Sequence, residues 1–375
     1  MSEFRSWVAT CPRGAEPALE AELGALGGKG IRPSKGAVRF TGPRETALRA
    51  CLSLRTALRV LEPIGEFDAP DADALYGGVR ALGWPELMTP RQTLAVQATG
   101  KSPGLEHGHF VELKIKDAIC DALRDALGAR PDVDVKSPDV LVVAHLAAGR
   151  CQLSLDLCGE LLSNRGYRVR GVAAPLRESL AAAVVLLSGW DGRRPFHDPL
   201  CGSGTIAIEA ALIGAGRAPN AARRLACEKW PRTSADDMRA LRLLREGLSA
   251  AGVEPPPILA SDRDPEAVEA TRANARAAGV PVRVFQADAR SIEPLSPPGQ
   301  IAMNPPYGER LEAGGRKQLK SFFHALGNAV GRLAGHRVAV LAGSPDFESA
   351  FGLRPRERRE LWNGPIRSRL YLYDL

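Results

Sequence analysis

The chain has 375 residues, of which 45% are hydrophobic and 25% are charged. This balance is typical of soluble globular proteins and argues against disordered and fibrous classes, and at about 150 residues per domain the length predicts two or three domains. The formal net charge of +7 and the pI near 9.2 come mostly from arginine, which favours a polyanionic partner without establishing one.

No run of the sequence approaches the roughly 20 apolar residues of a membrane span, and the first residues lack the pattern of a secretory signal. The 7 cysteines are scattered and never spaced as CxxC, which disfavours a disulfide framework and a zinc site. We therefore expect a cytoplasmic protein with no membrane association and no metal. The oligomeric state is left open.

The amino-terminal part of the chain alternates between strand-like and helix-like stretches, which predicts one or two α+β modules. The predicted strands are Trp7–Cys11, Leu94–Thr99, Val140–His145 and Cys151–Leu157. The predicted helices are Ala15–Leu26, Asp71–Leu82 and Phe110–Leu127. A polar, arginine-rich segment with three glycines, Gly159–Val172, follows the last of these strands and predicts a linker.

From Pro175 onward strands, glycine turns and helices follow one another, which predicts a parallel sheet with crossover helices. The predicted helices are Leu176–Leu187, Thr205–Ile213, Ser234–Ala251, Pro265–Ala278 and Lys317–Leu333. The predicted strands are Arg194–His197, Ile258–Ser261, Val282–Gln286, Gln300–Met303 and Arg337–Leu341. At the end of the chain, Glu357–Trp362 and Ser368–Tyr373 are expected to form an antiparallel pair joined through Asn363-Gly364.

The first motif with chemical content is DPLCGSGT, residues 198–205, between a predicted strand and a predicted helix. Its glycines let the backbone approach a ligand, and the helix start offers unpaired amides. A dinucleotide fingerprint would need a third glycine where Ala207 stands, and a triphosphate loop would need GK[ST], which is absent. The alternative is a structural tight turn.

Two acidic motifs follow the next two predicted strands. In SDRDP, Asp262 is the candidate for ribose hydroxyls, whereas Asp264 is expected to cap the helix that begins at Pro265. In QADA, Asp288 could accept a hydrogen bond from an adenine amino group, or it could be an ordinary surface acid.

The fourth motif, NPPYG, follows the apolar strand Ile301–Met303. Its prolines fix the backbone and leave carbonyl groups available, Asn304 adds a side-chain acceptor, and Tyr307 adds a flat face on which a base can stack. An exocyclic amine of a base is a poor nucleophile because its lone pair is delocalised into the ring. Two acceptors that hold its two hydrogens can orient the lone pair toward an electrophilic methyl group, so catalysis would rest on alignment and electrostatics.

In this order, DPLCGSGT, SDRDP, QAD and NPPYGER closely resemble the class I S-adenosylmethionine-dependent methyltransferases that modify amino groups. Together with Asn164–Arg168, Ala174–Leu180 and Leu361–Gly364, they resemble the THUMP-domain methyltransferases, in particular the bacterial 23S ribosomal RNA guanine 2-amino methyltransferase family. The resemblance covers most of the chain and is strongest from Leu155 to Leu375.

The resemblance implies a Rossmann-like α/β methyltransferase domain with a mostly parallel seven-stranded sheet and an antiparallel carboxy-terminal hairpin. It also implies an α+β ferredoxin-like and THUMP region before it that binds RNA. The expected boundaries are 1–67 for the ferredoxin-like domain, 68–160 for the THUMP domain, 161–174 for the linker and 175–375 for the catalytic domain. In some relatives a second methyltransferase is fused to this unit; because the sequence ends at Leu375, one activity is expected.

The resemblance also implies the roles of the site residues, with S-adenosylmethionine as the cofactor. Residues implied to hold it are Glu178, Asp198, Cys201, Gly202, Ser203, Gly204, Thr205, Asp262, Arg263, Asp288, Ala289 and Asn304. Residues implied to hold the target guanine are Asn304, Pro305, Pro306 and Tyr307.

Other substrates and one noncatalytic role stay open at this point. Guanine of transfer RNA, the 6-amino group of adenine in DNA and a protein glutamine amide could all be served by an NPPY loop, and a noncatalytic RNA-binding assembly factor is a further alternative. The amino-terminal region and the three arginines and tyrosine of Arg165–Arg170 favour RNA, because they are expected to reach phosphates and bases. The alternative for this segment is a solvated loop. Removal of residues 1–160 is expected to abolish RNA binding and to leave a catalytic half that folds.

Overall fold

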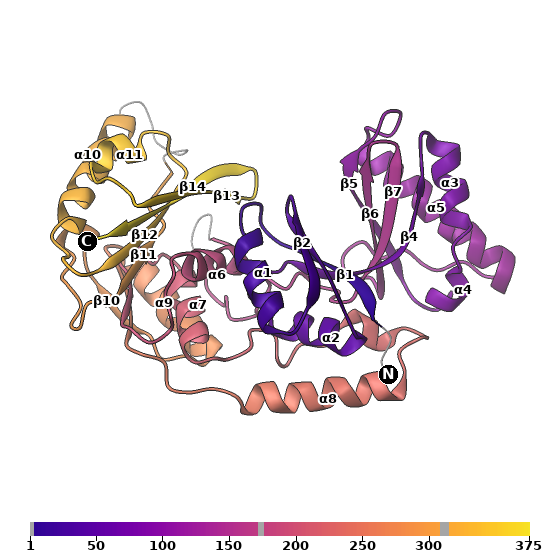
Figure 1. Cartoon of the computed structure of the whole chain (residues 1–375), viewed down its shortest axis with the longest axis horizontal. Helices are drawn as coiled ribbons and strands as arrows, with labels where there is room; N and C mark the ends of the chain where they lie inside the picture. Colours follow the sequence, from indigo (N-terminus) through magenta and orange to yellow (C-terminus); the bar gives the residue numbers. More distant parts are fainter. Residues whose placement is uncertain (1–3, 172–175, 308–314) are drawn as a thin grey trace.

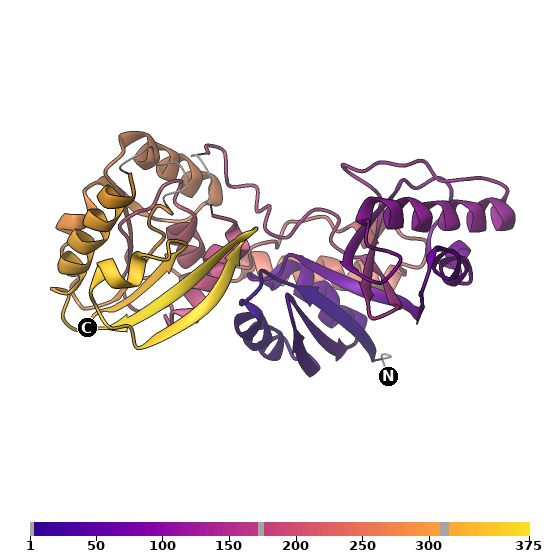
Figure 2. The same cartoon turned by 90° about the horizontal axis from the view of Figure 1, so that it is seen from above.

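The computed structural model describes residues 4–171, 176–307 and 315–375. The molecule is elongated, with one seven-stranded sheet spanning its amino-terminal half and a second at the other end (Figures 1 and 2). Two parts of the sequence motifs lie outside the described residues: Gly308–Arg310 of NPPYGER, and Ala174 and Pro175.

The first sheet has the strand order β2-β3-β1-β4-β7-β6-β5. Its neighbours are antiparallel except for β5 and β6, which run parallel. The strands are β1 (Arg5–Thr10), β2 (Lys29–Ser34), β3 (Ala37–Gly42), β4 (Arg59–Asp68), β5 (Leu94–Lys101), β6 (Val140–Ala147) and β7 (Arg150–Asp156). The helices of this half are α1 (Glu16–Ala25), α2 (Arg44–Ser53), α3 (Ala72–Arg80), α4 (Trp84–Leu87) and α5 (Gly108–Leu127).

Strand β4 joins the two modules of the amino-terminal half into one sheet. Its residues Arg59–Leu61 pair with β1, and its residues Leu61–Asp68 pair with β7. The boundary expected after residue 67 therefore falls at the last residue pair of a strand that both modules share. Because the backbone bonds continue across it, this point is not a flexible connection.

The second sheet has the order β10-β9-β8-β11-β12-β14-β13. The first five strands in this order are parallel, and β14 and β13 are antiparallel. The strands are β8 (Phe196–Asp198), β9 (Ile258–Asp262), β10 (Arg283–Gln286), β11 (Gln300–Met303), β12 (Arg337–Ala342), β13 (Glu357–Asn363) and β14 (Ile366–Asp374). The predicted mostly parallel sheet with a carboxy-terminal hairpin is confirmed, and the turn after Asn363 has Gly364 at a φ of +61°.

The helices around the second sheet agree with the predicted ones to within a few residues. They are α6 (Glu178–Leu187), α7 (Thr205–Gly214), α8 (Ala235–Ala250), α9 (Pro265–Ala278), α10 (Gly315–Val330) and the unpredicted short α11 (Phe347–Phe351). Asp264 caps α9 by accepting from the Glu266 amide at 2.9 Å, as the Asp-Pro pair predicts. No helix of the described ranges is long and apolar enough to cross a membrane.

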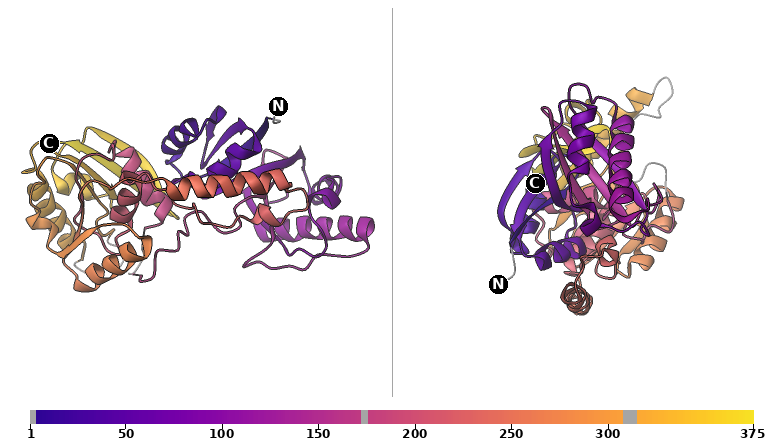
Figure 3. Two further views of the ribbon diagram at one scale, coloured as in Figure 1. Left: turned by 90° about the horizontal axis from the view of Figure 1, so that it is seen from below. Right: turned by 90° about the vertical axis from the view of Figure 1, so that its right-hand side faces the viewer.

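Residues 215–257 leave the second sheet and return to it, and we call them the insertion. It holds the 3-10 turn η1 (Ala226–Lys229) and α8, which lies along α2 on the underside of the molecule (Figure 3). The amide of Asn220 donates to the carbonyl of Leu52 at 3.1 Å, and Arg44 pairs with Asp237 at 3.3 Å.

One continuous hydrophobic core runs through both halves of the chain. It includes Leu52 and Leu54 of the amino-terminal half, Leu157 and Leu162 at the junction, and Leu241 of α8. Removal of residues 1–160 would expose this shared core, so the structure does not support a catalytic half that folds alone.

Candidate functional site

Side chains expected to be functional gather at the carboxyl ends of four adjacent parallel strands. Asp198 pairs in register with Ala260, and Gln286 pairs with Asp262, which brings the ends of β8, β9 and β10 to one edge. Ile301 pairs with His197, so Asn304 also extends past this edge. Ligands of open α/β sheets bind outside such strand ends.

The loop between β8 and α7, residues 199–204, is the glycine loop. Its backbone is fixed to β9, because the Cys201 amide donates to the Ser261 carbonyl and the Gly202 amide donates to Asp262 Oδ2, both at 3.0 Å. Gly204 has a φ of +85°, and a Cβ there would lie 2.7 Å from Thr271 Cγ2. Only glycine fits at this position.

Helix α7 begins at Thr205 without a side-chain cap. The hydroxyls of Ser203 and Thr205 lie 3.4 Å apart and are buried. The first turn therefore presents backbone amides and the positive end of the helix dipole to a ligand, an arrangement suited to a carboxylate.

Two polar residues on the buried face of α9 hold the glycine loop, and the sequence analysis missed both. Thr271 Oγ1 donates to the Gly202 carbonyl, and Asn274 Nδ2 donates to the Ser203 carbonyl, each at 2.9 Å. Asn274 Oδ1 also accepts the amides of Val169 and Arg170 at 2.9 Å. A threonine and an asparagine three residues apart among the alanines of this face were the available signal.

Asp198 is 1% exposed. Its burial, with a smaller contribution from nearby Asp262, raises the pKa of the carboxyl group to about 8. The Leu200 amide donates to Oδ1 at 3.2 Å and opposes this shift. Asp198 is thus a buried acid that would gain a charge if a cationic group were placed beside it.

His197, the residue before Asp198, was also missed. Its Nε2 lies 2.9 Å from Ser261 Oγ, which links β8 to β9. Burial lowers the pKa of this histidine to about 4, so it is neutral at pH 7.

The other acidic candidates make local contacts at the same edge. Asp262 accepts the Asp264 amide through Oδ1 at 3.0 Å as well as the Gly202 amide. Asp288 accepts from Arg290 Nε at 3.0 Å, and this pairing lowers the pKa of its carboxyl group. Two other residues predicted to hold the cofactor follow these acids in the sequence: Arg263, after Asp262, is exposed, and Ala289, after Asp288, is buried.

Asn304 follows β11, and its Oδ1 is buried with no hydrogen-bond partner among the described residues. A buried acceptor without a partner is costly and therefore informative. Pro305 is buried and Pro306 is exposed. The ring of Tyr307 lies against Gly343, where a Cβ would come within 2.7 Å of Tyr307 Cδ2. Gly343 follows β12 and leaves room for this ring, a role that the sequence analysis did not identify.

Arg168 connects the linker to this edge. Its Nη2 lies 3.1 Å from Glu178 Oε1 at the start of α6 and donates to Thr205 Oγ1 at 3.3 Å. Glu178, expected in the cofactor site, is therefore linked through Arg168 to Thr205, the first residue of α7.

Arg165 and Tyr167 do not face RNA, and the expectation for them was wrong. The side chain of Arg165 is 1% exposed, and its Nε lies 3.5 Å from Glu209 Oε1. Tyr167 donates its hydroxyl to the same oxygen at 3.0 Å. The side chains of Arg165 and Tyr167 therefore form a buried clamp on Glu209 and not a solvated loop, whereas residues 169 and 170 are exposed.

Replacing Glu209 with glutamine is expected to lower the free energy of unfolding by about 3–5 kcal/mol, because Arg165 would keep a buried charge without a partner. Denaturant titration measures the loss. The matched control is Glu269→Gln, which breaks the exposed pair with Arg272 and should cost less than about 1 kcal/mol. Equal losses in the two variants would contradict the clamp.

No group of three or more potential metal-binding side chains occurs within residues 4–171, 176–307 and 315–375.

Known proteins resemble this chain over nearly its whole length. Residues 6–61 match the RlmL ferredoxin-like domain, and residues 69–156 match the THUMP domain. A relative from Syntrophotalea carbinolica named "Ribosomal RNA large subunit methyltransferase K/L" is 39% identical over 382 residues, covering 98% of this chain and 53% of the relative. The chain thus spans about half the length of the curated relatives it matches.

Two solved structures superpose on nearly the whole chain. SMU.472, assigned as a methyltransferase and crystallised with SAH, has a TM-score of 0.87 and 30% identity, with coverage of 100% of this chain and 99% of that chain. A predicted N6-adenine-specific DNA methylase from Listeria monocytogenes has a TM-score of 0.86 and 28% identity, with coverage of 99% and 96%.

The family model of the RMKL-like methyltransferase domain matches residues 165–371, which is more than half of the chain and includes the glycine loop and Asn304. The chain therefore belongs to the RMKL-like methyltransferase family.

Proposed function

We propose that this chain transfers a methyl group from S-adenosylmethionine to the exocyclic 2-amino group of a guanine in 23S ribosomal RNA. The observation that carries the proposal is the unpaired, buried Oδ1 of Asn304 at the strand edge that also holds the glycine loop. An acceptor left without a partner suits a ligand that brings N–H groups, and an amino group of a base does so.

The residues at the edge fit the cofactor. The uncapped start of α7 would hold its carboxylate, and Asp198 would hold its amino group. Asp262 would accept from the ribose hydroxyls. Asp288 would face the adenine, and Arg290, which bonds both oxygens of this carboxylate in the structure, would have to release one of them. When bound, the cofactor supplies an electrophilic methyl group on a sulfonium.

The remaining cofactor contacts are assigned by position. Backbone groups of Cys201, Gly202, Ser203, Gly204 and Thr205 surround the methionine part, Arg263 and Ala289 flank the two acids, and Glu178 orders Arg168 beside the glycine loop.

Asn304, Pro305 and Tyr307 would hold the guanine. Asn304 Oδ1 and the Pro305 carbonyl accept the two amino hydrogens, so the nitrogen lone pair points at the methyl group. Tyr307 stacks on the base from a position that Gly343 fixes, and Pro306 stiffens the turn. These groups stabilise the charge that develops on the nitrogen by alignment and electrostatics.

We assign RNA recognition to the amino-terminal half, with residues 1–67 as the ferredoxin-like domain and 68–160 as the THUMP RNA-binding domain. The linker, 161–174, and the catalytic domain, 175–375, follow. The matched ranges 6–61, 69–156 and 165–371 support this division. A base inside a helix is inaccessible, so the target must be unpaired or flipped at a cost of about a few kcal/mol. The expected compartment is the cytoplasm.

Incubation of the purified chain with labelled S-adenosylmethionine and unmodified 23S ribosomal RNA tests the proposal. Nucleoside mass spectrometry should show N2-methylguanosine, mapped to one position. Because the Listeria structure is assigned to DNA adenine, DNA and transfer RNA serve as parallel substrates. Methyladenosine in DNA, or cofactor binding without transfer to any RNA, would contradict the proposal.

A further inference from the structure

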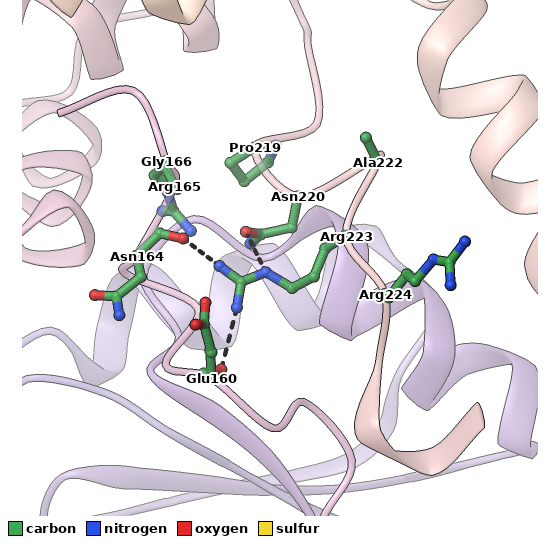
Figure 4. A pocket seen from close by; sticks show the side chains of 9 residues that line it. All are labelled: Glu160, Asn164, Arg165, Gly166, Pro219, Asn220, Ala222, Arg223 and Arg224. Atoms are coloured by element: carbon green, nitrogen blue, oxygen red, sulfur yellow. Dashed lines mark hydrogen bonds between the residues drawn. The ribbon is translucent and has the colours of Figure 1, made fainter. Parts of the chain in front are cut away.

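A cavity of about 390 Å³ lies where the linker meets the insertion. Asn164 and Gly166 of the linker line one side, and Pro219, Asn220, Arg223 and Arg224 of the insertion line the other (Figure 4). Neither the glycine loop nor the NPPY turn contributes to it.

Arg223 forms no direct ion pair with a carboxylate among the described residues, although the field of nearby Glu160 offsets part of its charge. Its Nε donates to Asn220 Oδ1, and its Nη1 donates to the carbonyls of Glu160 and Leu161, all at 3.1 Å. Nη2 donates to the carbonyl of Asn164. Burial lowers the pKa of this guanidinium, yet an arginine remains charged at neutral pH. A half-buried cation whose hydrogen bonds all go to neutral oxygens favours a nearby anion.

Asn220 supplies a second, independent feature. The residue is 4% exposed, and its Nδ2 is buried without a hydrogen-bond partner in the part of the chain that the structure describes. The orientation of the amide is fixed, because Oδ1 must accept from Arg223 Nε and Nδ2 is then the other atom. Asn220 and Arg223 line the same cavity (Figure 4).

The remaining charges of the cavity leave it positive. Arg224 is exposed and forms no ion pair within the described residues, whereas Arg165, which also lines the cavity, is paired with Glu209. Glu160 is the carboxylate among the lining residues and is exposed to solvent, where its field is screened.

We propose that this cavity binds a phosphate group of the RNA substrate, through Asn220 Nδ2 and the guanidinium groups of Arg223 and Arg224. This inference rests on the proposed function. RNA is favoured over a free anion because the volume leaves room for a sugar beside the phosphate. The same linker also continues to Val169 and Arg170, which Asn274 ties to the glycine loop. A phosphate held here would fix the strand whose base enters the site.

The variant Asn220→Asp tests the assignment with little change of shape. The new carboxylate keeps the acceptor for Arg223 Nε, removes the unpaired donor and adds a negative charge that neutralises Arg223. The dissociation constant for unmodified 23S ribosomal RNA should rise about tenfold, as for the loss of a hydrogen bond to a charged group. The slope of log affinity against log salt should fall by about one.

The control Asn328→Asp makes the same chemical change on the exposed face of α10 and should alter neither quantity. Affinity for S-adenosylhomocysteine should be unchanged in both variants. A folded Asn220→Asp protein with the parent's RNA affinity and salt slope would overturn the inference.

If Asn220→Asp does not fold, Arg224→Gln tests the phosphate site instead, because Arg224 is exposed and its replacement should not disturb folding. It should weaken RNA binding about threefold and lower the salt slope, whereas Arg332→Gln, an exposed position just after α10, should not. An unchanged slope in Arg224→Gln would overturn the inference.

Inorganic phosphate separates the two sources of the ligand group. At equal ionic strength it should weaken RNA binding more than chloride does, and this difference should vanish in Asn220→Asp. If phosphate binds the parent but Asn220→Asp has the parent's salt slope for RNA binding, the cavity is a site for a free anion. That result would overturn the RNA assignment. If the parent binds RNA through this site but forms no N2-methylguanosine, the proposed function fails while the phosphate site stands.

Discussion

Replacement of Asn304 with alanine is expected to lower kcat by about 10²–10³-fold, as for removal of one preorganised polar contact in a transition state. The side-chain oxygen holds an amino hydrogen of the base, and without it the nitrogen lone pair is not directed at the methyl group. Affinity for S-adenosylhomocysteine should change by less than about twofold, a result within the spread of surface effects. Single-turnover methylation of 23S ribosomal RNA measures the first quantity, and calorimetry measures the second.

The same variant separates a catalytic role from a structural one. Asn304 Oδ1 is buried without a partner in the described structure, so its removal should not destabilise the fold and should raise the free energy of unfolding by about 1 kcal/mol. A catalytic loss together with a gain in stability is the signature of a strained functional group. Asn304→Asp retains an acceptor and should keep more activity than alanine. Unchanged kcat in Asn304→Ala would contradict the assignment.

Local sequence signals predicted the start of one helix and the turn of one hairpin in the second sheet. Asp264 followed by Pro265 marked the start of α9, and Asn363 followed by Gly364 marked the final hairpin, because each pair has a strong conformational preference. Strand β2 was missed since it contains a glycine and a proline and is almost wholly exposed, as an edge strand can be. Strand β4 was missed because Glu62, Pro63 and Gly65 interrupt the alternation.

Contacts between distant segments could not be predicted from local pattern. The arginines and tyrosine of the linker suggest RNA contacts by type, but Glu209 is 44 residues away from Arg165 and lies on an apolar helix. Asn274 likewise contacts residues more than 70 positions earlier. Packing of α8 against α2 is a tertiary choice that the amphipathic pattern of α8 permits but does not specify. For the same reason, the cavity at Asn220 has no signature in the sequence.

Asp198 is expected to control the pH dependence of cofactor binding. Its pKa is raised to about 8 by burial, so at pH 6 the free protein holds this carboxyl group protonated. A cationic amino group bound beside it favours the carboxylate, and binding must then release a proton. Affinity should therefore rise up to about tenfold per pH unit below pH 8. It should fall again above that pH, as the amino group of the ligand, with an ordinary pKa of about 7.7–8.0, loses its own proton.

The variant Asp198→Asn should weaken cofactor binding by about 100-fold at pH 8, since one charge-assisted bond to a buried partner is lost. It should also remove the rising limb of the pH profile and keep only the fall. Calorimetry in buffers of different ionisation enthalpy counts the proton released, which should be one for the parent near pH 6–7 and none for the variant. Proton release by Asp198→Asn equal to that of the parent would contradict this role.

The stability of the protein without the cofactor should fall as pH rises toward 8, whereas the affinity for the cofactor should rise over the same range. The pKa of Asp198 in the folded chain lies above its ordinary value of 3.8, so the folded state binds the proton more tightly than the unfolded state. The contribution to stability is thus greatest below about pH 4 and is lost as pH rises to about 8. Asp198→Asn has no such loss, and its Tm should exceed that of the parent at pH 8 by more than at pH 5. A parent stabilised by Asp198 at pH 8 without the cofactor would show that a partner in the protein already balances this charge, and the carboxylate would then not be reserved for a cationic ligand.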